Sequence, residues 1–298
     1  METDLSQKIY VVTGATSGIG LAVAENLVSR GAAVIGAARS AERCREAERY
    51  LRRISPQARV DYFSADLSVQ RDVRRLAAEI TAFLDARGTT ALDGLVNNAG
   101  TFTYWLALTP DGIETQWAVN HLAAFLLTRL LEAPLKAAPA ARIVTVSSAS
   151  HTSGAIDWSD PQLRRSYNGL RAYGNTKLAN ILFTLELNRR LGTGSTLRAF
   201  AADPGLVKTD IGLKGTPSFA GLVWKLRRSG GISPEQSARG IAFLLEEPSL
   251  QNSAELYWKH GRPVRPSRGA LDPQAANRLW ALSAQMCGLQ EGGCGELS

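Results

Sequence analysis

Short apolar runs and longer amphipathic segments alternate along the chain. Mostly apolar runs of four to seven residues, rich in valine, isoleucine and alanine, predict strands that are buried on both faces of a parallel sheet. Most of these runs lie before residue 203, and a shorter one follows in the C-terminal part. The predicted strands cover residues 8–13, 32–38, 60–63, 92–96, 142–147, 196–202 and 255–258.

Helical periodicity occupies most of the intervals between these runs. Within residues 69–86, for example, Val73 and Leu76 fall on one face of a helix. A further periodic segment begins at about Thr109, and Pro110 then takes a favoured first-turn position. The predicted helices cover, approximately, residues 20–30, 69–86, 109–131, 173–191, 233–245 and 273–287.

Strands that alternate with helices predict an α/β fold, a doubly wound parallel sheet of the Rossmann type with right-handed crossovers. A chain of 298 residues can bury one large core, and it contains no repeat or linker. We therefore expect a single domain over residues 1–298. The segment at about 206–233 is predicted to be a mobile lid, and residues from about 260 to 298 form a C-terminal tail.

The composition, with 45% hydrophobic and 20% charged residues, is typical of a soluble globular protein. Apolar runs fall short of the ~20 residues that span a membrane, and no basic or apolar leader precedes the first strand. We expect no signal peptide, no membrane span and a cytoplasmic location. The cysteines Cys44, Cys287 and Cys294 have no metal-ligand spacing, so no metal site is predicted; Cys287 and Cys294 are either paired or two free thiols.

The net charge of +7 is an arginine charge, with 27 arginines and 7 lysines. The cationic residues are spread along the chain, in pairs such as Arg52-Arg53 and Arg189-Arg190, without interleaved aromatic residues. This distribution is typical of a solvated surface, and we expect no nucleic-acid partner.

A glycine-rich turn joins the first strand to the first helix and suggests a dinucleotide site. Glycines at 14, 18 and 20 let the backbone approach a pyrophosphate, which the free N–H groups of the helix N-terminus would bind. An NAD site usually has an acidic residue about twenty positions further on. Here Ala38 and Arg39 occupy that place, so Arg39 suggests a 2′-phosphate and hence NADP(H), with Arg43 one turn later. Alternatively, Arg39 simply ends a strand.

A tyrosine and a lysine, Tyr173 and Lys177, are four residues apart on a predicted helix and therefore share one face. An ammonium near the phenol should favour the ionised phenol and lower its pKa from ~10. Such a tyrosine can exchange a proton with a carbonyl or alcohol oxygen. The same spacing also occurs on solvated helices.

Several motifs in a fixed order carry a resemblance to a known family over residues 8 to about 210. The chain resembles the short-chain dehydrogenases/reductases of the single-domain type, and within them the retinol-dehydrogenase-like branch. The matching motifs are Thr13-Gly14-x-x-x-Gly18-Ile19-Gly20, Asp66-Leu67, Asn97-Asn98-Ala99-Gly100, Val119-Asn120-His121, Ser147-Ser148, Tyr173-x-x-x-Lys177-Leu-Ala-Asn180 and Pro204-Gly205.

The resemblance implies a role for each matching residue. Tyr173 would be the general acid/base, and Lys177 would bind the nicotinamide ribose. Ser148 would hydrogen-bond the substrate oxygen, and Asn120 would hold the water of a proton relay. The implied NADP(H)-binding residues are Gly14, Ser17, Gly18, Ile19, Gly20, Arg39, Asp66, Leu67, Asn98, Ala99, Gly100, Tyr173, Lys177, Pro204, Gly205, Val207 and Thr209.

We therefore expect an NADPH-dependent ketone or aldehyde reductase, reversible to alcohol oxidation, that acts on a bulky apolar or aromatic substrate, such as one of secondary metabolism. Aromatic residues that could line its pocket are Tyr104, Trp105, Trp158 and the lid's Phe219 and Trp224; each could instead belong to the core. The expected assembly is a homodimer or homotetramer. Alternative functions are a non-catalytic NADP-binding regulator and a sugar-nucleotide epimerase or dehydratase.

Overall fold

The computed structural model describes residues 4–207 and 231–290. Several predicted residues lie outside the described residues, namely Thr209, Cys294 and the lid residues Phe219 and Trp224.

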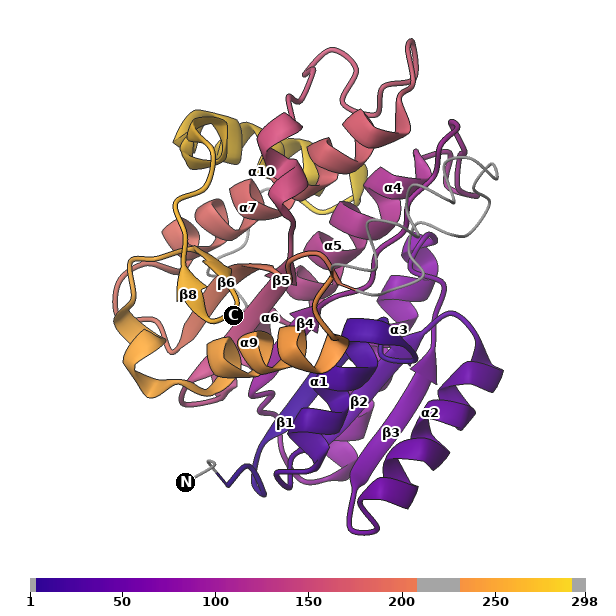
Figure 1. Ribbon diagram of the computed structural model, residues 1–298, viewed down its shortest axis with the longest axis vertical. Coiled ribbons are helices and arrows are strands. Elements are labelled where there is room, and N and C mark those ends of the chain that lie inside the picture. Colours follow the sequence, from indigo (N-terminus) through magenta and orange to yellow (C-terminus); the bar gives the residue numbers. More distant parts are fainter. Residues whose placement is uncertain (1–3, 208–230, 291–298) are drawn as a thin grey trace.

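An eight-stranded sheet with the order β3-β2-β1-β4-β5-β6-β7-β8 forms the centre of the molecule. Neighbouring strands run parallel except β8, which pairs antiparallel with β7. Figure 1 shows β3 and β8 at opposite edges. The doubly wound α/β prediction is thus confirmed. The strands are β1 Ile9–Thr13, β2 Ala33–Ala38, β3 Arg59–Ser64, β4 Gly94–Asn97, β5 Ala141–Val146, β6 Leu197–Asp203, β7 Tyr257–Lys259 and β8 Arg262–Pro263.

Helices cover both faces of the sheet (Figure 1). Val12 of β1 packs with α1, α2 and α9, whereas its neighbour Val11 packs with α3, α5, α7 and α10. Successive side chains of one strand thus enter different cores, as the wholly apolar runs predicted. The helices are α1 Gly18–Val28, α2 Ala41–Ile54, α3 Gln70–Ala86, α4 Thr115–Trp117, α5 Ala123–Leu130, α6 Glu132–Ala137, α7 Gly169–Leu191, α9 Pro234–Glu246 and α10 Pro273–Met286.

Short helices of other types complete the described chain. A π-helical turn, η1 (Ala118–Leu122), separates α4 from α5. Turns of 3₁₀-helix follow β5, α9 and β8: η2 Ala149–Ser153, η3 Pro248–Asn252 and η4 Arg268–Leu271.

The prediction that a helix begins near Thr109 is wrong. Pro110 lies in a turn that contains Gly112 at a φ of +70°, and α4 begins only at Thr115. The helix begins later because Glu114, and not Thr109, caps its N-terminus. The carboxylate of Glu114 accepts hydrogen bonds from the backbone N–H groups of residues 116 and 117, at 2.9 and 2.6 Å.

Helix α2 and strand β8 were not predicted. The buried stripe of α2 consists only of Cys44, Ala47 and Leu51, which is too sparse for a clear helical period. Strand β8 is two residues long and contains a proline, a residue found at sheet edges.

Strand β1 lies between β2 and β4, and this is the point at which the strand order reverses. In open α/β sheets, ligands bind beyond the carboxyl ends of the strands at such a point. The residues that follow β1, β2, β4, β5 and β6 therefore form the candidate site. Across the described ranges, no helix combines the length and the apolarity that a membrane crossing requires.

Candidate active site

The glycine turn after β1 is packed against the loop after β4. Gly14 has a φ of +67°, and a Cβ at this position would lie 2.9 Å from the side-chain nitrogen of Asn98. A Cβ at Gly20 would lie only 2.3 Å from the carbonyl oxygen of Gly14. Asn98 also donates to the carbonyl of Thr13 at 2.8 Å, which joins the ends of β1 and β4. Glycine is therefore required at both positions for this turn to close.

The N-terminus of α1 opens onto this turn. Ser17 is the N-cap residue, but its side chain makes no capping hydrogen bond, and the first turn contains no acidic residue. Gly18, with a φ of +54°, leads into the helix. Free N–H groups and the positive end of the helix dipole suit a pyrophosphate. A dinucleotide therefore fits the predicted residues Gly14, Ser17, Gly18, Ile19 and Gly20.

The ends of β2 and β3 lie beside this turn and would hold the adenosine half of the dinucleotide. Arg39 follows β2 and is exposed, and Arg43 is exposed in the first turn of α2. Neither guanidinium forms an ion pair with any carboxylate within the described ranges. Asp66 accepts a hydrogen bond from the backbone N–H of Ser68 at 3.0 Å, while Leu67 is buried. The two arginines are thus available to a phosphate.

Tyr173 and Lys177 share one face of α7, as predicted. The Lys177 ammonium lies 5.3 Å from the centroid of the Tyr173 ring. Lys177 is only 3% exposed, and its Nζ donates to the carbonyl of Val146, the last residue of β5, at 3.1 Å. Within the described ranges the Tyr173 hydroxyl has no hydrogen-bond partner, so it can bond a substrate oxygen.

The expectation that the pKa of Tyr173 lies below its ordinary value is wrong. Burial raises the pKa of Tyr173 to about 12, and the nearby Asp203 carboxylate raises it further. Burial lowers the pKa of Lys177 to about 8, and Asp203 opposes that change. The loss of water around the phenol therefore outweighs the effect of the neighbouring ammonium on the pKa of Tyr173. At neutral pH Lys177 is charged and Tyr173 protonated.

Ser148 and Ser147, two neighbouring serines, have different partners at the end of β5. Ser147 is buried and donates to the carbonyl of Lys177 at 2.8 Å, which is a structural role. The Ser148 hydroxyl caps η2 by accepting from the backbone N–H of Ser150 at 3.2 Å. Ser148 is only half-buried, so its hydroxyl remains accessible to a substrate.

Two glycines set the distance between Ser148 and Tyr173. A Cβ at Gly174 would lie 2.9 Å from the carbonyl oxygen of Ser150, and a Cβ at Gly154 would lie 2.7 Å from that of Gly174. Because neither glycine has a side chain, η2 packs directly on the backbone of α7. This close packing places the segment that contains Ser148 next to the face of α7 that carries Tyr173.

Asn120 lies in the π-helical turn η1, a type of distortion that is frequent at functional sites. Its side chain accepts from the backbone N–H of Thr101 at 2.7 Å and donates to the Thr101 carbonyl and the Thr176 hydroxyl. The backbone carbonyl of Asn120 accepts a hydrogen bond from the side chain of Asn180 at 3.0 Å. The side chain is thus fully used in holding the loop after β4, and a relay water would have to bind the Asn120 carbonyl.

The end of β6 contributes the predicted residues Pro204, Gly205 and Val207. Gly205 has a φ of +77°, and its N–H donates to the Asp203 carboxylate at 2.8 Å. Asp203 is buried and also accepts from the Tyr257 hydroxyl at 3.2 Å. Val207 pairs with Ile232 in an isolated β-bridge. The carboxylate thus fixes the turn that contains the predicted NADP(H)-binding residues Pro204 and Gly205.

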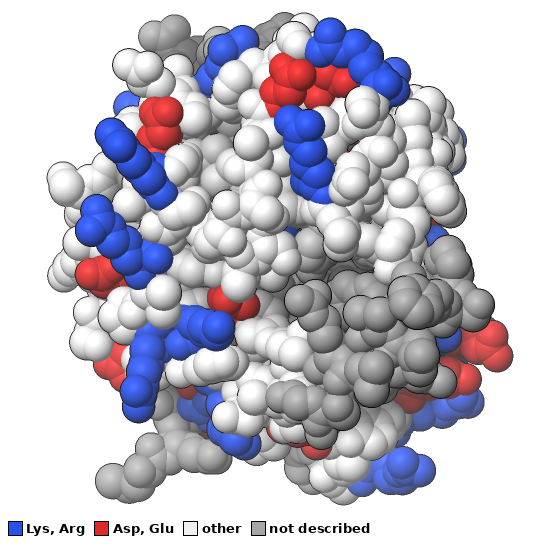
Figure 2. Space-filling model, turned by 45° about the horizontal axis from the view of Figure 1, so that its top comes forward, with Lys and Arg blue, Asp and Glu red and all other residues white. Residues whose placement is uncertain are grey.

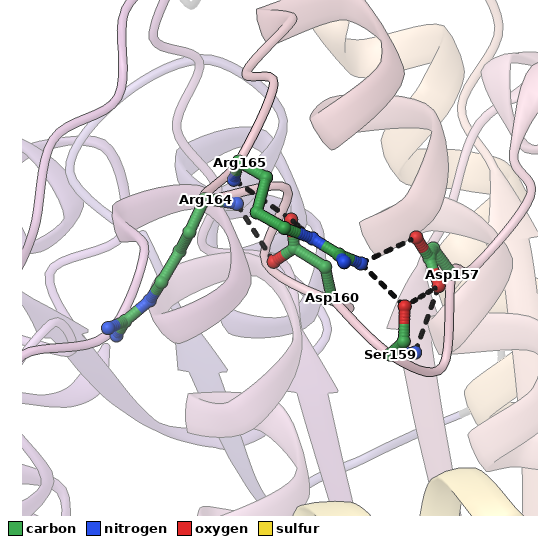
Figure 3. Close-up of polar contacts among 5 residues, drawn as sticks. All are labelled: Asp157, Ser159, Asp160, Arg164 and Arg165. Atoms are coloured by element: carbon green, nitrogen blue, oxygen red, sulfur yellow. Dashed lines mark hydrogen bonds and ion pairs between the residues drawn. The ribbon is translucent and has the colours of Figure 1, made fainter.

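The segment between Ser148 and Tyr173 is held by its own polar contacts (Figure 3). The Asp160 carboxylate accepts from the backbone N–H groups of Arg164 and Arg165, at 2.9 Å each. These N–H groups hold the pKa of Asp160 below its ordinary value. The side chain of Arg165 reaches back to Asp157, whereas that of Arg164 points away. The segment is therefore a folded loop.

Aromatic residues surround the Tyr173 ring on one side. Phe102 meets Tyr173 edge-on with 5.8 Å between the ring centroids, and Tyr104 meets Phe102 at 4.7 Å. Trp105 is 73% exposed. Trp158, which was expected in the pocket, instead lies under the Arg278 guanidinium of α10 at 4.9 Å. It lines a surface hollow of about 530 Å³ that contains none of the predicted catalytic residues.

Basic side chains are scattered over the face shown in Figure 2 and lie among acidic ones. Among the described residues, they form no continuous basic strip on that face. Within the described ranges no group of histidine, cysteine and acidic residues could hold a metal ion.

Four residues of the site were not identified from the sequence: Thr13, Tyr62, Phe102 and Asp203. The Thr13 hydroxyl accepts from the N–H groups of Asn98 and Ala99, at 3.0 Å each. The Tyr62 phenol crosses Gly36 and donates to the carbonyl of Ala15 in the glycine turn at 2.8 Å. Three of these positions carried a signal: Thr13 begins a family motif, Phe102 lies two residues after one, and Asp203 directly precedes Pro204-Gly205.

His121 is another buried titratable group beside the site. It is 0% exposed, its Nε2 lies 2.8 Å from the Ser283 hydroxyl, and its Nδ1 lies 3.3 Å from Asn180 Oδ1. Burial lowers the pKa of His121 to about 4. The folded protein therefore holds this histidine neutral at physiological pH.

Comparisons with known proteins agree with the motifs. The family model described as short chain dehydrogenase matches residues 8–216. Human retinol dehydrogenase 13 is 36% identical over 95% of this chain and 85% of its own, and human retinol dehydrogenase 14 is 35% identical over 95% and 87%. These similarities confirm the resemblance to the retinol-dehydrogenase-like branch.

Solved structures share this fold. A protein of Mycobacterium paratuberculosis is 34% identical, with a TM-score of 0.70 over 96% of both chains. The angucycline C-6 ketoreductase LanV, solved with bound NADP, is 27% identical, with a TM-score of 0.68 over 86% of this chain and 95% of its own.

The pKa of His121 predicts a loss of stability in acid. The unfolded chain binds a proton near pH 6.5, whereas the folded protein binds it only near pH 4. Stability is therefore full above pH 6.5 and falls by about 3 kcal/mol as the pH decreases to 4. Urea unfolding of the wild type and His121→Asn should show a free-energy difference that shrinks by this amount between pH 7 and 4. Parallel pH curves would show that His121 titrates normally.

Proposed function

Because the chain belongs to the short-chain dehydrogenase family, we propose that it is an NADPH-dependent reductase of bulky apolar or aromatic ketones and aldehydes, reversible to alcohol oxidation. As a member of this family it is an enzyme that acts on alcohol or carbonyl groups. The proposal adds the choice of cofactor, the substrate class and the direction.

The observation that carries the proposal is the aromatic edge beside the Tyr173 phenol. Phe102 and Tyr104 extend from this ring in two edge-on contacts, at 5.8 and 4.7 Å. Phe102 is itself buried and supports Tyr104, which is partly exposed. A ring system or chain bound against this edge gains ~25 cal/mol per Å² of apolar surface buried. A small polar carbonyl has little surface to bury there, so bulk and apolarity favour binding.

Proton transfer is assigned to Tyr173. Its hydroxyl donates a proton to the carbonyl oxygen, which Ser148 also holds by a hydrogen bond. Lys177, charged at neutral pH, stabilises the phenolate that forms and would bind the nicotinamide ribose. The reduced nicotinamide supplies the hydride when NADPH is bound. Thr13, Asn98 and the glycine turn would hold its pyrophosphate against the N-terminus of α1.

Support for NADPH comes from the end of β2. Arg39 and Arg43 are both exposed there, and no described acidic side chain forms an ion pair with either. A 2′-phosphate would give two guanidinium groups a charge-assisted partner. The similar ketoreductase LanV was solved with NADP bound.

Support for the substrate class comes from the names of relatives. They are retinol dehydrogenases and a ketoreductase of an angucycline. We propose a substrate of similar apolar, ring-bearing character, such as an aromatic compound of secondary metabolism.

Removal of Arg39 tests the cofactor assignment. A charge-assisted phosphate contact contributes ~1.5–3 kcal/mol, so Arg39→Ala should weaken NADPH binding roughly 10- to 100-fold and leave NADH binding nearly unchanged. Dissociation constants are measured by fluorescence titration. Arg49→Ala, an exposed arginine further along α2, is the matched control. Wild-type preference for NADPH retained in Arg39→Ala would refute the assignment.

A substrate panel tests the reaction. NADPH consumption should be faster, in kcat/KM, with polycyclic ketones, apolar aldehydes and quinones than with sugars or short polar ketones. Tyr173→Phe should lower kcat by at least ~100-fold because it removes the proton donor, while NADPH binding persists. Tyr50→Phe on α2 controls for the loss of a phenol. If sugars were the best substrates, or if Tyr173→Phe kept most of its kcat, the proposed function would be wrong.

A further inference from the structure

His121 lies directly after Asn120 in the π-helical turn η1, and the proposed reaction makes no use of its imidazole. The ring is fully buried among Trp117, Phe125 and Phe183, with centroid distances of 5.2, 6.4 and 6.4 Å. An apolar side chain would fill this space without the cost of burying two polar nitrogens. The hydrogen bonds of His121 therefore need an explanation.

The partners of His121 define the direction of each hydrogen bond. The two side-chain N–H groups of Asn180 point to the carbonyls of Asn120 and Val146, at 3.0 and 3.1 Å, so Asn180 Oδ1 faces the histidine. Oδ1 can only accept, hence His121 Nδ1 carries the proton and donates. Nε2 is then the acceptor, and the Ser283 hydroxyl donates to it at 2.8 Å.

The result is a one-way chain from the C-terminal helix to the catalytic groups. It runs from Ser283 on α10 through His121 to Asn180, and its members are buried, with exposed fractions of 0%, 0% and 1%. Asn180 ends the chain on two carbonyls. One is that of Asn120, and the other, that of Val146, also accepts the Lys177 ammonium.

We propose that His121 is a positioning residue that, through Asn180, fixes the Val146 carbonyl that binds Lys177, and so holds the ammonium in its working place. The inference rests on the proposed function where turnover is the readout. It also makes Ser283, on α10 and more than a hundred residues from Tyr173, part of the support of the active site.

Loss of this chain should change Lys177 in a definite direction. Without the Asn180 donor, the Val146 carbonyl becomes a stronger acceptor for the ammonium, and looser packing admits water. Both effects favour the charged amine and raise its pKa. The titratable groups beside Lys177 are Tyr173 and Asp203, while the described neighbours of His121 are uncharged.

The experiment compares His121→Leu, which fills space without a donor, with His121→Asn, whose amide can still donate to Asn180. Phe125→Leu is the control for packing, because Phe125 lies in the same aromatic cluster and makes no hydrogen bond through its side chain. The readouts are kcat, KM, thermal unfolding, and the pH midpoint above which NADPH affinity falls as Lys177 loses its proton.

In His121→Leu we expect kcat to fall about tenfold with little change in KM, and the pH midpoint to rise by about one unit. His121→Asn should keep most of the wild-type kcat and midpoint, and Phe125→Leu should keep both. A folded His121→Leu that behaves as the wild type would overturn the inference. So would equal effects of Leu and Asn, or of Phe125→Leu, because packing alone would then explain them.

If His121→Leu does not fold, Ser283→Ala tests the hydrogen-bond chain instead, since this variant removes only a hydroxyl. It should lower kcat roughly threefold and raise the midpoint in the same direction; no change in either would reject the chain. If the wild type reduces no carbonyl in the panel, the proposed function fails, whereas the pH midpoint of NADPH binding still decides the role of His121.

Discussion

The hydrogen bond from the Lys177 ammonium to the Val146 carbonyl is the interaction on which the site depends. It holds a charged group in a place that is only 3% exposed, where burial brings the pKa of the amine down to about 8. The bond exists because β5 ends at Val146, opposite Ala202 of β6, and α7 packs against both of these strands. Tyr173 is placed one helical turn away by the same helix. The register of β5 against β6 and the position of α7 therefore together determine where the Lys177 ammonium lies.

The C-terminal part of the chain supports each catalytic element separately. Tyr257 bonds the Asp203 carboxylate, which fixes the turn after β6. The backbone N–H of Ser267 donates to Nε2 of His151, whose Nδ1 lies 2.8 Å from the Ser148 carbonyl. Ser283 reaches Asn120 and Lys177 through His121. These contacts make residues 257–286 a part of the active-site structure, although none of them was expected to touch the substrate.

The sequence was sufficient for the sheet, the glycine turn and the Tyr173–Lys177 pair, because each depends on periodicity or on a short motif. It failed where burial or long-range contacts decide. The Tyr173 pKa was expected to fall, but the loss of water around the phenol raises it. Phe102 and the orientation of His121 follow from contacts between distant elements, which no local pattern encodes. Helix α4 begins later than predicted because the Glu114 carboxylate caps it there. The turn before it, which contains Pro110, only resembles the start of a helix.

The pH dependence of kcat/KM for NADPH tests the central claim most directly, since this quantity reports groups of the free enzyme. If a buried, charged Lys177 is required, the value falls above about pH 8 with the loss of one proton. Lys177→Arg, whose side chain stays charged, should be less active but should show no such fall up to pH 10. A wild-type profile that stays level to pH 10, or an identical fall in Lys177→Arg, would contradict the account.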